Sequence, residues 1–410
     1  MTVEKPTSQL LQILNNASPA RRVLAARRPD RHIADSARFP FLAVVGQSEM
    51  KLALILALIN PGIGGVLLMG PRGTGKTTAV RGLIDLLPQA QRSTCSNGCE
   101  PEAAYALGMD AVCPDCAAKL GRGESITALD RMRLIELPLN ARLEDVIGGI
   151  NERIAIEQNK VRVEPGILST ADQNLLYIDE VNLLDDSVVD AILDAAAQGQ
   201  YTVRRGPLAA TYRARLVLIG SMNPEEGWLR PQIQDRFGLR VLVRGLSGAA
   251  ERLEVYHRVR TFRTNPYVLV AEWAAELPVV ADEIAAARAR LSSVTIPSGS
   301  EAVGMKWIRD LGIDSHRAEA TLFESARARA AADDRAEVTR ADLRAVAPMA
   351  LRQRRSRVIT EFFESQSEED SEIARTIDRA GRKSKNPVSP LPRSAPLRGP
   401  SGNRVASRRK

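Results

Sequence analysis

Short apolar runs of four to six residues recur through the first 245 residues, separated by turn residues and helical patterns. Runs of this length without polar alternation are typical of strands buried on both faces, as in a parallel sheet. The stretches between them carry apolar residues at helical spacing and predict flanking helices. The sequence therefore predicts an α/β domain over 39–246. Its predicted strands are 66–69, 134–139, 175–178, 215–220 and 239–243, and its clearest helices are 48–59, 78–87 and 183–197.

Weaker patterns predict two hairpins and a second domain. Apolar residues flank residues 157–160 and Gly206-Pro207, which predicts β-hairpin insertions near 151–164 and 200–213. After Ser247 the chain becomes rich in Ala and Arg, and an all-α lid domain is expected over 247–360. Its candidate helices are 248–263, 266–275, 279–290, 298–311, 315–332 and 339–353.

The net charge of +8 comes from the two ends of the chain. Residues 1–38 carry +4, and residues 381–410 carry nine basic residues and no acid, which leaves −5 for residues 39–380. A mildly acidic body argues against a nucleic-acid motor, and no specific nucleic-acid partner is expected. We expect a flexible leader at 1–38, an acidic helical extension at 361–380 and a disordered basic tail at 381–410. No apolar run is long enough for a membrane span.

The first predicted strand runs directly into a G-x-x-x-x-G-K-T segment, and a helix follows it. This spacing between a strand and a helix is that of a P-loop, which binds nucleoside triphosphates. The glycines let backbone N–H groups approach phosphate, and the helix N-terminus adds partial positive charge. Lys76 is expected at the β- and γ-phosphates of ATP, and the Thr77 hydroxyl on Mg²⁺. The candidate ATP-binding residues are Gly70, Pro71, Arg72, Gly73, Thr74, Gly75, Lys76, Thr77 and Thr78.

Polar residues end two other predicted strands. Asp179 and Glu180 follow strand 175–178, and in a P-loop protein they are expected to hold Mg²⁺ and to deprotonate the attacking water, respectively. Asn223 follows strand 215–220, where it either lies beside the γ-phosphate or forms a turn before proline. Arg236 is expected at the end of a short helix, where it either completes a neighbouring subunit's site or forms a surface salt bridge.

All four cysteines of the chain lie in one insertion, at 92–124. Cys95 and Cys99 are separated by three residues, Cys113 and Cys116 by two, and thirteen residues lie between the pairs. Two close pairs are compatible with a structural Cys₄ zinc site, since four thiolates leave no open position for catalysis. A redox-active pair and four plain thiols remain alternatives.

Several segments together resemble the I subunit of magnesium chelatase, an AAA+ ATPase. The resemblance covers residues 39–360 and is most specific over 223–239. The segments that carry it are Phe39-Pro40-Phe41, Val44-Val45-Gly46-Gln47, Asn60 to Val66, Tyr177 to Leu184, Asn223 to Gly227, Leu229 to Gln232 and Asp235 to Leu239.

This resemblance implies an ATP-hydrolysing motor that drives Mg²⁺ insertion into protoporphyrin IX, in chlorophyll or bacteriochlorophyll synthesis for photosynthesis. It implies a homo-oligomeric ring, expected to be a hexamer, together with a D subunit and a porphyrin-binding H subunit. In the AAA+ pattern, sensor 1 falls on Asn223, the trans arginine finger on Arg236 and sensor 2 on Arg317. The adenine is expected near Val44, Val45 and the lid.

Other AAA+ functions remain open on the sequence. These are the ATPase of a related chelatase such as cobaltochelatase, a MoxR-like ATPase that remodels proteins, and a nucleic-acid motor. The expected location is the bacterial cytoplasm, or the chloroplast stroma if the Arg-rich leader is a transit segment.

Overall fold

A computed structural model of the chain describes residues 37–95, 99–150, 163–205, 208–355, 366 and 369–377. The chain divides into two units, Met1–Arg355 and Ser356–Lys410, and the first contains the sheet and the lid helices. In the second unit residues 369–377 are helical, within the expected acidic extension. The basic tail, nearly all of the leader and the tip of the first hairpin lie outside the described residues.

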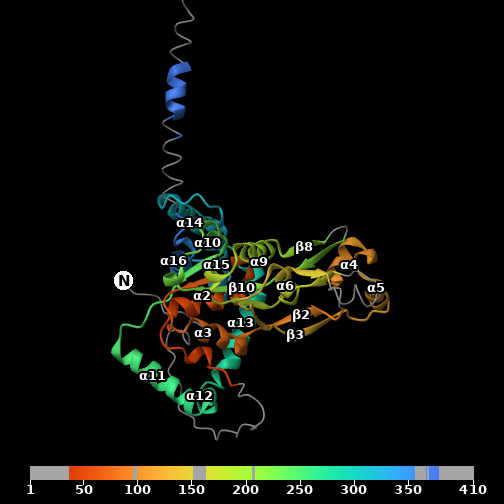
Figure 1. Cartoon of the computed structure of the whole chain (residues 1–410), viewed down its shortest axis with the longest axis horizontal. Helices are drawn as coiled ribbons and strands as arrows, with labels where there is room; N and C mark the ends of the chain where they lie inside the picture. Colours follow the sequence, from red (N-terminus) through yellow and green to blue (C-terminus); the bar gives the residue numbers. More distant parts are fainter. Residues whose placement is uncertain are drawn as a thin grey trace, which may run out of the picture. The chain divides into compact units, whose positions relative to one another are not determined.

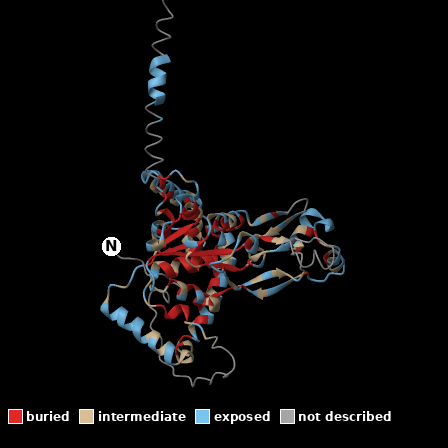
Figure 2. Cartoon of the chain, viewed as in Figure 1, coloured by how far each residue is buried: buried red, intermediate tan, exposed pale blue. Residues whose placement is uncertain are grey.

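Five parallel strands form the central sheet, in the order β11-β1-β10-β7-β4. Figure 1 labels the middle strand of this sheet, β10. In β1, Val66 and Leu68 pack into one hydrophobic core. The intervening Leu67 and Met69 pack into a second core on the opposite face, because successive side chains of a strand alternate. The buried residues of the sheet lie at the centre of this unit (Figure 2). The strands are β1 (Val66–Met69), β4 (Leu134–Glu136), β7 (Leu175–Ile178), β10 (Val217–Met222) and β11 (Leu239–Leu242).

Helices cover both faces of this sheet. The core on one face includes residues of α2, α3 and several lid helices, and the other core includes residues of α6, α8, α9 and α10. The helices of the α/β domain are α2 (Ser48–Ile59), α3 (Lys76–Gly82), α6 (Leu143–Ile147), α8 (Ile167–Thr170), α9 (Asp186–Gln198) and α10 (Pro231–Arg236). Short 3₁₀ turns are η1 (Phe41–Ala43), η2 (Pro61–Ile63), η3 (Leu83–Leu86), η5 (Val181–Leu183) and η6 (Pro224–Glu226).

Three antiparallel pairs project from the domain. β8 (Gln200–Arg205) and β9 (Leu208–Arg213) form the predicted second hairpin. β5 (Gly148–Ile150) pairs with β6 (Val163–Pro165) around the first predicted hairpin. The pair β2 (Gln89–Ser93) and β3 (Thr127–Arg131) was not expected, because these strands are mostly polar and half-exposed. Between them lie α4 (Pro101–Leu107), η4 (Met109–Ala111) and α5 (Pro114–Gly121), which contain or flank the cysteines.

The lid contains the six expected helices. α15 packs against α16 and also against α2 of the α/β domain, so the lid closes one face of the sheet. The first helix, α11, buries none of its residues fully. The lid elements are α11 (Ala249–Thr264), α12 (Pro266–Glu272), α13 (Glu276–Arg290), η7 (Leu291–Ser293), α14 (Ser298–Asp310), α15 (Arg317–Ala332) and α16 (Arg340–Leu351).

Element boundaries differ from the expectations at several functional places. The helix after the P-loop begins at Lys76 instead of Thr78, because Gly75 (φ +86°) caps it in a left-handed conformation. Strand β10 extends to Met222, so Ser221 belongs to the strand. Strand β4 ends at Glu136, three residues early, since Leu137 is followed by Pro138. The described residues contain no helix with the length and apolar character that a membrane crossing requires.

Candidate active site

The P-loop lies between β1 and α3, at the carboxyl edge of the sheet. At Gly70 a side chain is excluded, since a Cβ atom there would lie 2.0 Å from the Val243 carbonyl oxygen. Gly73 and Gly75 have φ values of +77° and +86°, which other residues rarely adopt. The Lys76 ammonium donates to the carbonyl oxygens of Gly70 and Pro71, at 2.6 and 2.9 Å. The Lys76 ammonium is therefore held by hydrogen bonds to the backbone of the P-loop.

The Asp179 carboxylate is oriented by three hydroxyl groups. Thr77 Oγ1 donates to Asp179 Oδ2 at 3.1 Å. The Tyr177 hydroxyl donates to Asp179 Oδ1 at 2.9 Å, and Ser221 Oγ donates to the same oxygen. Burial raises the pKa of Tyr177, so the phenol stays protonated and remains a donor. The contact between a threonine hydroxyl and a carboxylate brings together two hard oxygen ligands of the kind that Mg²⁺ prefers.

Glu180 lies beside this cluster in an unusual backbone conformation. Its φ of +49° is left-handed, which is uncommon for a residue other than glycine. Its backbone N–H donates to Ser221 Oγ at 3.2 Å, and its carboxylate lies 3.6 Å from the Arg72 guanidinium. Arg72 also pairs with Glu226, so it links the P-loop to two acids across the site.

Asn223 forms the turn that the sequence left open as one alternative, and its place beside the γ-phosphate stays a prediction. Its Oδ1 accepts from the Glu225 N–H at 3.3 Å and caps the turn η6. The residue is also buried, with 3% of its surface exposed, and it lines the same cavity as the P-loop. The asparagine is therefore a turn residue that also faces the candidate phosphate site.

Two adjacent cavities share part of the P-loop. The smaller, of about 190 Å³, is polar, and burial lowers the pKa of its Lys76 despite the neighbouring acids. The larger, of about 690 Å³, extends from the loop to η1 and α11, and its wall includes Val44 and Val45. Arg258 of α11 closes this wall by donating to the Ala43 carbonyl oxygen at 2.9 Å. The smaller cavity is lined by Arg72, Gly73, Thr74, Gly75, Lys76, Thr77, Thr78, Asp179, Glu180, Ser221, Met222 and Asn223.

Comparisons with known proteins agree with this arrangement. The family model "Magnesium chelatase, subunit ChlI" matches residues 40–104 and 152–235, and the model "AAA lid domain" matches 308–377. A protein of Methanocaldococcus jannaschii named magnesium-chelatase subunit ChlI homolog is 42% identical over 320 residues, which are 78% of this chain and 86% of that protein. The magnesium-chelatase 38 kDa subunit of Acidiphilium rubrum is 41% identical, over 78% of this chain and 91% of that protein.

The chain belongs to the magnesium chelatase subunit I family. Its fold is that of an AAA+ ATPase, with a parallel α/β domain and a helical lid, as expected from the sequence. Members of this family also include a chloroplastic protein of Arabidopsis thaliana, magnesium-chelatase subunit ChlI-2, which is 37% identical over 84% of this chain and 82% of that protein.

Two expected site residues, Arg236 and Arg317, are not among the residues that line the two cavities. Within the described part of the chain, Arg236 is at the end of α10 and pairs with Asp190 and Asp194 of α9, at 3.1 and 2.8 Å. Arg317 begins α15 and lies 3.5 Å from Asp235. Because Asp235 and Arg236 are adjacent in the chain, both arginines are near the same end of α10.

The sequence reasoning missed Tyr177 and Ser221, which complete the hydrogen bonds around Asp179. The two-residue repeat of side chains along a β-strand could have identified both residues. Tyr177 is two residues before Asp179, and Ser221 is two residues before Asn223, so each points to the same side of the sheet as a site residue. A polar side chain two residues before a candidate site residue, in an otherwise apolar strand, therefore indicates a further member of the site.

Proposed function

We propose that this chain is the ATP-hydrolysing motor subunit of a magnesium chelatase, which drives Mg²⁺ insertion into protoporphyrin IX for chlorophyll or bacteriochlorophyll synthesis. The observation that supports the ATPase part is the hydrogen bond from Thr77 of the P-loop to Asp179, because both side chains offer oxygen ligands of the kind that Mg²⁺ prefers. The chelatase part is supported by the names of two relatives, because the alignment with this chain covers most of the length of each relative.

In this proposal the two cavities take the two halves of ATP. The larger, apolar cavity beside Val45 receives the adenine, and the smaller receives the phosphates next to Lys76. The Thr77 hydroxyl and Asp179 would hold the Mg²⁺ of Mg-ATP, which neutralises phosphate charge. The Mg²⁺ that enters the porphyrin is a separate ion, a substrate of the whole chelatase.

Hydrolysis then depends on positioning and charge. Lys76 balances the negative charge that develops on the phosphates, Asn223 lies beside the γ-phosphate, and Glu180 orients the attacking water. Glu180 accepts the proton of that water at a carboxylate oxygen. This requires the Arg72 side chain, which now faces Glu180, to turn toward the phosphates.

We infer that Arg236 and Arg317 act on the ATP of a neighbouring copy. Neither is among the residues that line the phosphate cavity of its own chain, and both adjoin Asp235. A head-to-tail ring would bring this end of α10 against the next subunit's site. The ring, expected to be a hexamer, would work with D and H subunits in a bacterial cytoplasm or a chloroplast stroma.

A reconstitution tests this proposal. The full chain is mixed with D and H subunits of the same source, ATP, Mg²⁺ and protoporphyrin IX, and the absorption spectrum of the Mg-porphyrin is followed. We expect the signal to appear with the wild type and to disappear with Lys76→Ala. Lys306→Ala, an exposed lysine of α14, serves as the matched control and should retain activity.

Other outcomes separate the alternatives. Hydrolysis of ATP without any insertion, with partners from the same source, would contradict the chelatase function and favour a MoxR-like or cobaltochelatase-like role. Hydrolysis stimulated by DNA would favour a nucleic-acid motor.

A further inference from the structure

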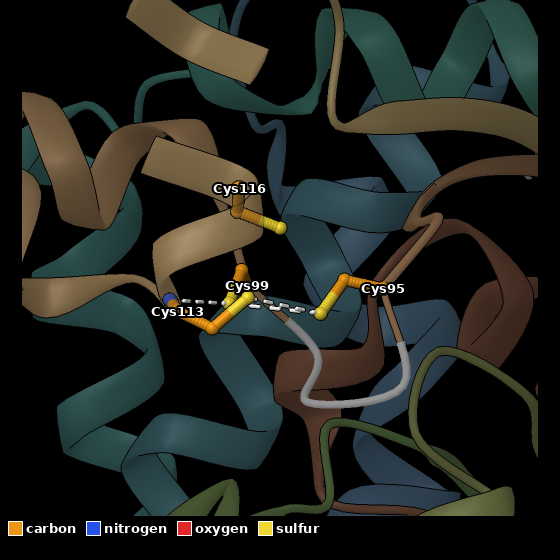
Figure 3. A group of neighbouring side chains, drawn as sticks. All are labelled: Cys95, Cys99, Cys113 and Cys116. Atoms are coloured by element: carbon orange, nitrogen blue, oxygen red, sulfur yellow. Dashed lines mark hydrogen bonds between the residues drawn. The ribbon is translucent and has the colours of Figure 1, made fainter. Parts of the chain in front are cut away.

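The insertion between β2 and β3 brings all four cysteines of the chain to one point. Cys95 follows β2, Cys99 precedes α4, and Cys113 and Cys116 lie at the start of α5. Their side chains point toward one another (Figure 3). All four Sγ atoms lie within 4.8 Å of one another. Residues that are up to 21 positions apart thus meet in a single cluster.

The sulfur spacing fits a tetrahedral metal site. The Sγ atom of Cys95 lies 3.9 Å from that of Cys99 and 3.6 Å from that of Cys113. A disulfide requires an S–S distance of about 2.05 Å, and none of the four cysteines is in one. Four thiolates at about 2.3 Å from a tetrahedral Zn²⁺ are separated from each other by about 3.8 Å. The two distances from Cys95 match the second arrangement.

The surroundings also suit a structural ion. Cys99 and Cys116 are 8% and 2% exposed, so the centre of the cluster is shielded from water. The backbone N–H of Cys113 donates to Cys99 Sγ at 3.2 Å. Hydrogen bonds of this kind from the knuckle backbone stabilise the charge of metal-bound thiolates.

The described residues of the insertion form only a small apolar core of their own. Apart from the cysteines, its buried apolar residues are Ala104, Val112 and Ile126. Larger apolar side chains face outward, with Tyr105 77% and Leu107 79% exposed. A segment with so small a core usually needs a disulfide or a metal to fold.

We propose that Cys95, Cys99, Cys113 and Cys116 bind one structural Zn²⁺. The four thiols release their protons on binding, and no coordination position remains open for catalysis. The site goes beyond the proposed ATPase function. Cys113 and Cys116 lie in 105–151, a segment that the magnesium chelatase family model leaves unmatched.

The ion also positions a contact with the second hairpin. Glu100, next to Cys99, pairs with Arg213 at the end of β9 and with Arg215, at 2.7 and 2.6 Å. Arg215 pairs in turn with Asp172, at 2.9 Å. By holding Cys99 in place, the zinc would fix Glu100 and attach the insertion to the hairpin β8–β9.

The test is a metal analysis of the full chain, purified under reducing conditions without a metal-affinity column. We expect about one zinc per chain by inductively coupled plasma mass spectrometry. Cys113→Ser and Cys116→Ser should lower the metal affinity by more than about 100-fold. Ala111→Ser adds a hydroxyl to the same insertion without removing a thiol, and should keep the zinc. Co²⁺ exchanged into the wild type should give the visible absorption bands of a tetrahedral thiolate site.

A second measurement does not depend on variants that fold. Zinc is removed from the wild type with a chelator, and hydrogen exchange is compared before and after removal. The amides of α4 and α5 should exchange faster, whereas those of β1 and α9 should not change. This readout is independent of ATP hydrolysis, so a failed chelatase assay leaves the zinc inference standing.

Three results would overturn the inference. The first is a chain that holds no zinc and gives no Co²⁺ spectrum after supplementation, with four thiols that react freely in the native state. The second is a disulfide in zinc-free protein purified without a reductant. It would be detected as a mass about 2 Da below that of the fully reduced chain, because a disulfide lacks two thiol hydrogens. The third is zinc that stays bound in both serine variants.

Discussion

At the scale of single residues, the candidate site depends on how one carboxylate is oriented. Asp179 accepts hydrogen bonds from Thr77, Tyr177 and Ser221, and Ser221 also accepts the N–H of Glu180. One serine therefore sets the position of both acids. A carboxylate held by several donors is preorganised to accept a metal without first rearranging.

Tyr177→Phe tests this orientation. The change removes the hydroxyl that donates to Asp179 at 2.9 Å and leaves the ring in the core. A single hydrogen bond is worth about 1 kcal/mol. We therefore expect kcat for ATP hydrolysis to fall about fivefold and the Mg²⁺ concentration for half-maximal rate to rise, with ATP binding nearly unchanged.

The matched control is Tyr105→Phe, since Tyr105 is 77% exposed on the cysteine insertion. It should leave hydrolysis unchanged. A Tyr177→Phe variant whose Mg²⁺ dependence equals that of the wild type would show that this hydroxyl does not orient the metal ligand.

At the scale of elements, the last lid helix is held by a buried acid at its start. Asp342 is 0% exposed and forms a capping box with Thr339. It also pairs with Arg329 and Arg335, which belong to α15 and the turn after it. This carboxylate joins the two helices that form the centre of the lid.

Asp342→Asn should destabilise the lid in a pH-dependent way. Burial alone raises the pKa of Asp342, but hydrogen bonds from Arg335 and Thr339 outweigh it and hold this pKa below its ordinary value. A depressed pKa means that the carboxylate stabilises the fold above its unfolded pKa, and that this contribution is lost as the pH falls through the folded pKa. Near neutral pH the variant should lose about 3 kcal/mol, because two arginines lose their charged partner.

The measurement is urea denaturation at several pH values, followed by Trp fluorescence. The difference between wild type and variant should be constant from neutral pH down to about pH 4, and should shrink below it. Asp310→Asn, at an exposed position of α14, should cost less than about 0.5 kcal/mol. An equal difference at all pH values would mean that Asp342 acts through its shape and not its charge.

At the scale of the whole molecule, we expect the site to be complete only when two copies of the chain meet. Arg236 pairs with Asp190 and Asp194, and Arg317 adjoins Asp235, so neither reaches its own phosphate cavity. If both act on a neighbour, hydrolysis requires assembly. The acids that now hold Arg236 would keep it in place until a neighbour's phosphates compete for it.

Mixing two inactive variants tests this arrangement. Lys76→Ala lacks its own site but keeps Arg236, and Arg236→Ala lacks the arginine but keeps its own P-loop. In a random one-to-one ring, about one quarter of the interfaces combine an intact P-loop with an intact arginine. We expect each variant alone to be nearly inactive and the mixture to recover roughly that fraction of the wild-type ATPase rate.

The control is a mixture of Lys76→Ala with Glu180→Gln. Both changes damage the same chain's site, so a wild-type arginine cannot restore either, and no activity should return. Recovery in this control, or none in the first mixture, would contradict a site that is shared between subunits.

The sequence by itself determined most of the sheet and the P-loop. Strands β1 and β7 occur where uninterrupted apolar runs predict them, because every residue of both strands is buried. The six lid helices occur, within a few residues, where the Ala- and Arg-rich sequence predicts them. The residues from Arg72 to Thr78, with Asp179, Glu180 and Asn223, follow three predicted strands. They line one cavity, because parallel strands end at one edge of the sheet.

Tertiary structure decided what depends on residues that are distant in the chain. β2 and β3 pair with each other and are half-exposed, so neither strand has a face of apolar residues. The sequence pattern therefore did not predict them. The hydroxyls of Tyr177 and Ser221 matter because two strands place them against Asp179. The four cysteines left three interpretations open in the sequence, and only their convergence within 4.8 Å favours a metal. The spacing of apolar residues along the chain reflects which side chains are buried, so it can be read from the sequence. Contacts between residues that are distant in the chain form only when the whole unit packs, so the sequence pattern does not show them.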